Sequence, residues 1–216
     1  MTKQKELVII TIFALLLLGF VVFNHYRIVF PTPVQIDVEG RPTLGSPDAP
    51  VHLVVFEEPR CNRCKKFWVE VFPKIKEMFI DSGDVKLTVI PVSFMPDSLV
   101  ATEALMCISE QDDLYFYGFI DHLYKEQPSQ DSDWTDIGIW EEIAKQVGQN
   151  VDVDRVKQCI SGQNLRKAVE DNTAYARKLM GGKITTPVVY VNGLIVNDPT
   201  FPQIRIFINR ELKERK

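Results

Sequence analysis

Cys61 and Cys64 lie between a strand pattern and a helix pattern, and this restricts the fold more than any other feature of the 216-residue chain. The residues VHLVVF at 51–56 are apolar and rich in β-branched side chains, as in a buried central strand. After the cysteines, apolar residues at 67–79 repeat at helical spacing. We therefore expect a strand, a turn that carries Cys61, and a helix that begins at the pair.

The start of a helix gives the first cysteine a chemical advantage. Its unpaired backbone N–H groups favour the thiolate form of Cys61, and Arg63 and other nearby cations add positive charge. Cys64 lies one turn further on, where it can close a disulfide or resolve a mixed one. A stabilised thiolate makes the disulfide more oxidising. The pattern predicts thiol–disulfide exchange with Cys61 attacking, Cys64 resolving and no other cofactor.

Two other uses of the pair are weaker. A zinc site needs further ligands, yet Cys107 and Cys159 lack a close cysteine or histidine in the sequence, and the histidines show no ligand spacing. We expect no metal site. A disulfide across so few residues is strained and therefore labile, which favours a redox role over a structural one.

Composition excludes several classes of protein. Apolar residues make up 45% of the chain, as in an ordinary globular domain and not in a disordered one. The 25 Lys and Arg against 29 Asp and Glu give a net charge of −4, so we expect no nucleic-acid partner.

The residues LVIITIFALLLLGFVVF at 7–23 carry no charge and no polar face. A cleaved signal peptide and an uncleaved membrane anchor both begin this way. The large and aromatic residues that follow offer no small-x-small cleavage site, so we favour an anchor over residues 1–24. Lys3 and Lys5 favour a cytoplasmic N-terminus, which places the rest of the chain on the extracytoplasmic side.

The remaining chain divides by pattern. Residues 25–50 are rich in proline and suit an extended tether, within which alternating apolar residues at 34–38 predict an edge strand. Residues 51–95 read as strand, helix and strand, and residues 96–181 as a block of helices. Residues 182–216 read as a hairpin, with its turn at Asn192-Gly193, and a final amphipathic helix.

A second signal is the Thr186-Pro187 pair directly before a predicted strand. Proline cannot donate a ladder hydrogen bond, so here it marks an edge strand, a cis peptide or a simple strand start. The sequence alone leaves these open.

Taken together, these motifs resemble one family. The stretches GSPDAPVHLVVFEEPRCNRCKKF, CISEQDDLYFYGFIDHLYKEQ, KQCISGQ and ITTPVVYVNG are similar to the DsbA-like thiol:disulfide oxidoreductases of the bacterial cell envelope. The resemblance implies an α/β thioredoxin fold formed by residues 51–95 and 182–216, with an inserted helical domain at 96–181. It also implies that Pro187 is cis against Cys61, and that Thr186 presents its backbone to a substrate strand.

Further expectations come from the same resemblance. Cys107 and Cys159 match cysteine positions in some relatives, which implies a structural disulfide; two buried free thiols are the alternative. The implied activity introduces disulfides into reduced or misfolded secreted or envelope proteins. The implied setting is the periplasm or another extracytoplasmic space, with an integral membrane redox partner for regeneration. We expect a monomer.

The chain departs from the family near the active site. Asn62 and Arg63 stand where oxidising members often have Pro and His, and Arg63 could replace the stabilising histidine. Val55 stands where many relatives have a buried acid. Glu57 and Glu58 follow it; they could relay protons to Cys64, but we expect a solvated loop pair.

The departures leave other functions open. A disulfide reductase or isomerase would use the same chemistry. A thioredoxin-like chaperone without turnover would use only the scaffold. Copper delivery through the two thiols would favour extra Met or His residues near them, and His52 alone lies between positions 51 and 72.

Overall fold

Five strands form one mixed sheet in the computed structural model, which describes residues 3–29 and 32–214. The order across the sheet is β1-β3-β2-β4-β5, and only β2 and β3 run parallel. The bounds are β1 Thr43–Leu44, β2 Val51–Glu57, β3 Val85–Pro91, β4 Val188–Val191 and β5 Leu194–Val196. The predicted central strand, second strand and hairpin are therefore confirmed.

The register of the central strands brings distant segments together. Val55 of β2 lies opposite Val189 of β4, and Phe56 lies opposite Val188. The end of β2, which leads into the cysteine pair, therefore meets the beginning of β4, which follows Pro187.

The side chains of the sheet alternate between two cores. Val51, Leu53 and Val55 face the larger core, which the helices after the cysteine pair and the C-terminal helix cover. These helices are α2 Asn62–Lys66, α3 Phe72–Ile75 and α9 Phe201–Glu214, and π-helical turns at Phe67–Val71 and Lys76–Ile80 extend α2 and α3. Val54 and Phe56 face the smaller core beneath one helix of the insertion, α8.

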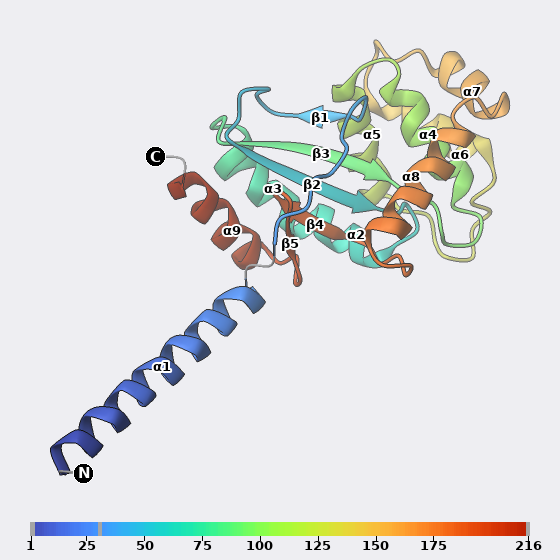
Figure 1. Ribbon diagram of the computed structural model, residues 1–216. Coiled ribbons are helices and arrows are strands. Elements are labelled where there is room, and N and C mark those ends of the chain that lie inside the picture. The colour runs from blue at the N-terminus through green and yellow to red at the C-terminus, as the bar shows by residue number, and fades with distance from the viewer. Residues whose placement is uncertain (1–2, 30–31, 215–216) are drawn as a thin grey trace.

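The predicted helical block is present between β3 and β4. It consists of α4 Leu99–Ser109, α5 Asp113–Lys125, α6 Ile137–Val147, α7 Val153–Ser161 and α8 Arg166–Leu179. Figure 1 shows these helices gathered at the end of the sheet toward which β2 and β3 run. Trp134 and Trp140 are fully buried among them. The insertion thus covers the end of the sheet where the cysteine pair lies.

The predicted edge strand at residues 34–38 is wrong. This segment makes no strand; instead Ile36 and Val38 pack against the smaller core, so it crosses a face of the sheet and does not extend an edge. One backbone bond, from the Val34 N–H to the Gly193 carbonyl at 2.9 Å, ties it to the hairpin. Strand β1, at Thr43–Leu44, forms the edge instead.

Glycine is required at the tip of the hairpin. Asn192 and Gly193 have φ values of 47° and 81°, as the predicted two-residue turn demands. A Cβ atom on Gly193 would lie 2.2 Å from the Val34 carbonyl oxygen. The turn therefore also holds the segment that precedes the sheet.

The N-terminal helix α1 extends over Lys3–Val29. Its portion Lys3–Asn24 is long and apolar enough to cross a membrane, and it is not buried against the rest of the protein. An anchor and a signal sequence share these properties.

Candidate active site

Cys61 caps the N-terminus of α2. Its backbone is extended, and the Cys64 N–H donates to its sulfur at 3.4 Å. Its carbonyl accepts the Lys65 N–H at 3.0 Å, which is the first bond of the helix. Cys61 is partly exposed, and both thiols of the pair are free.

Hydrogen bonds lower the pKa of Cys61 to about 5. The largest cause is the hydrogen bond from the Cys64 thiol, followed by a contact with Thr186 and by the backbone N–H groups of Cys64 and Arg63. Partial burial opposes them. The thiolate of Cys61 is therefore the expected form at neutral pH.

The positive side chains contribute less than the sequence indicated. Asn62 and Arg63 are exposed, and Arg63 acts on the sulfur through its backbone N–H. Solvent screens a long exposed cation, whereas N–H groups at a helix start point at the sulfur. The structure therefore supports a contribution from the Arg63 backbone N–H, and stabilisation by its side chain stays a prediction.

Cys64 has the opposite environment. Its side chain is only 1% exposed, and burial is the largest cause that raises its pKa. The hydrogen bond with Cys61, the charge of that thiolate and the nearby Glu57 raise it further. The two thiols thus differ in both acidity and access.

The loop before β4 lies beside Cys61. The Thr186–Pro187 peptide bond is cis, as the family resemblance implies. Thr186 is buried, and its carbonyl oxygen lies 3.5 Å from the Cys61 sulfur. The register of β2 and β4 makes this contact across 125 residues of sequence.

Glu57 and Glu58 do not form a solvated loop pair, so that expectation is wrong. Glu57 is 2% exposed and Glu58 is fully buried, and both contact the side chain of Tyr124 in α5 of the insertion. The Tyr124 hydroxyl donates to the Glu57 carboxylate and lies 3.1 Å from the Glu58 carbonyl oxygen. Burial raises the pKa of Glu57 to about 8 and that of Glu58 to about 7.

Glu57 places a buried acid near the position where many relatives have one and this chain has Val55. Alternate residues of a strand share a face, so Glu57 points toward the same side as Val55, one step closer to the cysteines. When it is ionised, its negative charge raises the pKa of the Cys64 thiol. Tyr124, which the sequence analysis did not single out, is its hydrogen-bond partner.

A disulfide joins Cys107 of α4 to Cys159 of α7, with an S–S distance of 2.00 Å. It lies within the insertion, apart from the cysteine pair at α2. Within residues 3–29 and 32–214, no group of three or more His, Cys, Asp or Glu side chains is arranged to hold a metal ion.

The chain is similar to known proteins over most of its length. A family model described as Thioredoxin matches residues 37–210. Disulfide bond formation protein D of Bacillus subtilis is 31% identical over 181 residues, which cover 83% of this chain and 80% of that protein.

Two solved structures are similar as well. The crystal structure of Chlamydia trachomatis DsbA is 30% identical, has a TM-score of 0.76, and covers 86% of this chain and 99% of that one. Oxidised BdbD from Bacillus subtilis is also 30% identical at a TM-score of 0.76, covering 84% and 98%.

Proposed function

Because the chain belongs to the DsbA-like thiol:disulfide oxidoreductases and is an oxidase-type enzyme of that family, we propose that Cys61 and Cys64 introduce disulfides into secreted or envelope proteins. The observation that carries this assignment is the opposite perturbation of the two thiols. The pKa of Cys61 is lowered in a partly exposed position, and that of Cys64 is raised in a buried one. The cysteine pair is the only redox group that the reaction needs.

The proposed reaction starts from the oxidised pair. A client thiolate attacks the Cys61 sulfur, because Cys61 is the accessible member of the pair. The Cys61–Cys64 bond breaks, and Cys64 leaves with the electron pair and takes up a proton, as its raised pKa favours. A second client thiolate then attacks the client sulfur of the mixed disulfide. Cys61 leaves as a thiolate, the client has lost two electrons, and the pair has gained them.

We assign proton transfer at Cys64 to Glu57. Its pKa of about 8 keeps the buried carboxyl protonated at neutral pH, and in its ionised form it raises the pKa of the Cys64 thiol. Tyr124 holds the carboxyl in place. Glu57 can therefore give a proton to Cys64 as it leaves, and accept one when the pair is oxidised again.

The loop at Thr186 and Pro187 is the proposed contact for the client backbone. The Thr186 carbonyl lies beside the Cys61 sulfur, so a client segment in an extended conformation would meet it when the mixed disulfide forms.

An integral membrane protein that accepts electrons from the reduced pair is the proposed partner for regeneration. Helix α1, which is long and apolar enough to span a membrane, supports an anchored enzyme with its domain outside the cytoplasm. We propose that it works there as a monomer.

The assignment can be tested on the full chain in detergent. Thiolate absorbance against pH should place the titration of Cys61 in the Cys64→Ser variant near pH 5 to 6, whereas Cys61→Ser should show no thiolate below about pH 8.5. With glutathione disulfide as electron acceptor, the wild type should oxidise a reduced, unfolded client and Cys61→Ser should not. A potential near that of thioredoxin, about −270 mV, would contradict the oxidase direction and favour a reductase.

A further inference from the structure

Three successive backbone carbonyls before Cys61 each accept a hydrogen bond from the helical insertion. The Tyr124 hydroxyl lies 3.1 Å from the carbonyl oxygen of Glu58. The side-chain amide of Gln127 donates to the carbonyl of Pro59 at 2.7 Å. The amide of Gln130 donates to the carbonyl of Arg60 at 3.0 Å. The donors are spaced three residues apart, at the end of α5 and in the loop that follows it.

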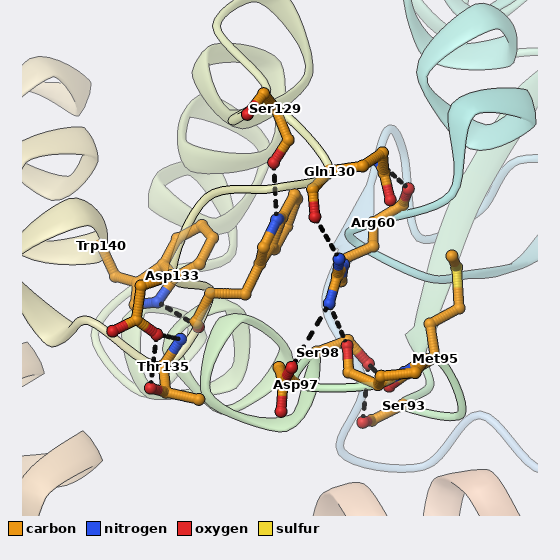
Figure 2. Close-up of polar contacts among 12 residues, drawn as sticks. Arg60, Ser93, Met95, Asp97, Ser98, Ser129, Gln130, Asp133, Thr135 and Trp140 are labelled. Atoms are coloured by element: carbon orange, nitrogen blue, oxygen red, sulfur yellow. Dashed lines mark hydrogen bonds and ion pairs between the residues drawn. The ribbon is translucent and has the colours of Figure 1, made fainter.

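The side chain of Arg60 in turn donates hydrogen bonds to the insertion. Figure 2 shows its guanidinium between two loops of the insertion. It donates to the Gln130 carbonyl at 2.6 Å and to the Pro96 carbonyl. It also lies 3.8 Å from the carboxylate of Asp97 and 5.1 Å from the centre of the Trp134 ring. The side chain is only 11% exposed, although it immediately precedes the nucleophile.

The two loops that hold Arg60 are themselves fixed. The indole N–H of Trp134 donates to the Ser129 carbonyl at 3.0 Å. In the other loop, the Ser98 hydroxyl donates to the Met95 carbonyl at 3.0 Å and lies 2.9 Å from the hydroxyl of Ser93 (Figure 2). The guanidinium therefore bridges two ordered loops.

These contacts act on the part of the backbone that sets the position of Cys61. The Cys61 N–H donates to the Glu58 carbonyl at 3.0 Å, so residues 58–61 form one turn. The same turn directs the Cys61 sulfur at the Cys64 N–H, 3.4 Å away. A shift of less than one ångström in this turn would weaken that bond, because hydrogen bonds depend steeply on geometry.

We propose that Gln127, Gln130 and Arg60 are positioning residues, through which the helical insertion holds the turn at residues 58–61 and keeps the Cys61 sulfur at the start of α2. The insertion therefore contributes to the thiol chemistry and does more than cover the site. This inference rests on the proposed role of Cys61 as the attacking thiol.

The test compares two kinds of glutamine in the full-length protein. The double variant Gln127→Met/Gln130→Met removes two amide donors to the turn and keeps side-chain length. The matched control is Gln111→Met, because the Gln111 amide also donates to a backbone carbonyl, that of Asp152 at 2.9 Å, but within the insertion alone. Thiolate absorbance is measured against pH in a Cys64→Ser background.

We expect the double variant to raise the pKa of Cys61 by about one unit, which lowers the thiolate fraction about tenfold below the pKa. At pH 6 the thiolate fraction should therefore fall about twofold, from a pKa of about 5 to one of about 6. Client oxidation by the variants that retain Cys64 should slow as well, because Cys61 leaves the mixed disulfide more slowly when its pKa is higher. Gln111→Met should leave both unchanged. Equal shifts in the double variant and in Gln111→Met would overturn the proposal, as would a folded double variant in which Cys61 titrates as it does with Cys64→Ser alone.

Arg60 provides a second test that does not depend on the double variant folding. Arg60→Met and Arg63→Met remove the same charge three positions apart, but only Arg60 bridges the loops. We expect a higher Cys61 pKa in Arg60→Met, partial rescue in Arg60→Lys, and little change in Arg63→Met. Similar shifts in Arg60→Met and Arg63→Met would show a charge effect and contradict positioning.

The Cys64→Ser protein without further substitutions, here called the parent, distinguishes a failure of the proposed function from a failure of the positioning role. A parent Cys61 that titrates near pH 8.5 would contradict the proposed function itself. A low parent pKa that none of the turn variants changes would contradict the positioning role alone.

Discussion

The thiolate of Cys61 should make the stability of the reduced protein depend on pH. In the folded protein its pKa is lowered to about 5 from an ordinary value of 9.0. A group whose pKa is lowered on folding stabilises the folded state above its ordinary pKa, and this stabilisation is lost as the pH falls through the folded value. The reduced protein should therefore lose stability between about pH 9 and pH 5.

The expected magnitude follows from the size of the shift. A lowering of this size corresponds to at most about 5 kcal/mol, of which most would be lost between pH 8 and pH 5. Because Cys61 is partly exposed, solvent screening reduces the expected loss to about 2 kcal/mol over that range. The Cys61–Cys64 disulfide closes a short loop and favours the oxidised form by about 2 kcal/mol at every pH. The pH dependence is therefore a sharper test than the order of the two redox forms at one pH.

The assay is urea unfolding of reduced wild type and reduced Cys61→Ser at pH 5, 6, 7 and 8. Glu57 and Glu58 titrate in the same range, with pKa values of about 8 and about 7, and both are present in the variant. Subtracting the unfolding free energy of Cys61→Ser from that of the wild type therefore cancels the part of their contribution that does not depend on the thiolate. The wild type should lose about 2 kcal/mol relative to Cys61→Ser between pH 8 and pH 5. Parallel curves for the two proteins would refute the argument that folding stabilises this thiolate.

Three other variants test the buried acid, the disulfide of the insertion and the hairpin turn. Glu57→Gln should stabilise the protein by about 3 kcal/mol at pH 7 in urea unfolding. Burial raises the pKa of the Glu57 carboxyl, so keeping it protonated in the folded protein costs free energy that grows from pH 4.5 to about 8. The same variant should slow client oxidation, and an unchanged rate would remove Glu57 from the proposed proton transfer. Replacing both Cys107 and Cys159 by Ala should lower the free energy of unfolding by up to about 4 kcal/mol, because the disulfide spans a sequence separation of 52 residues, and client oxidation should persist. Loss of client oxidation in the folded variant would contradict a purely structural role. Gly193→Ala should cost about 1–3 kcal/mol and speed proteolysis at residues 34–41, because its Cβ would meet the Val34 carbonyl; unchanged proteolysis would show that the segment is held elsewhere.

Local chemistry determined the elements that the sequence predicts well. The apolar run at residues 51–56 is a buried strand because β-branched side chains pack well on a pleated surface. Asn192 and Gly193 form the hairpin turn because both adopt positive φ values. Cys61 sits at a helix start because the helical pattern begins directly after it, and this local position also accounts for the N–H groups that favour its thiolate.

Packing between distant segments decided the rest. The sequence shows Glu57 and Glu58 as charged residues in a connection, but burial depends on what covers them, and the covering side chain of Tyr124 lies 67 positions away. Likewise, nothing in residues 126–130 indicates that two glutamines bind the turn before Cys61. The thiol pair could be read from the sequence because its chemistry depends on neighbours along the chain. The buried acid and the positioning of the turn could not, because they depend on how the insertion packs against the end of the sheet.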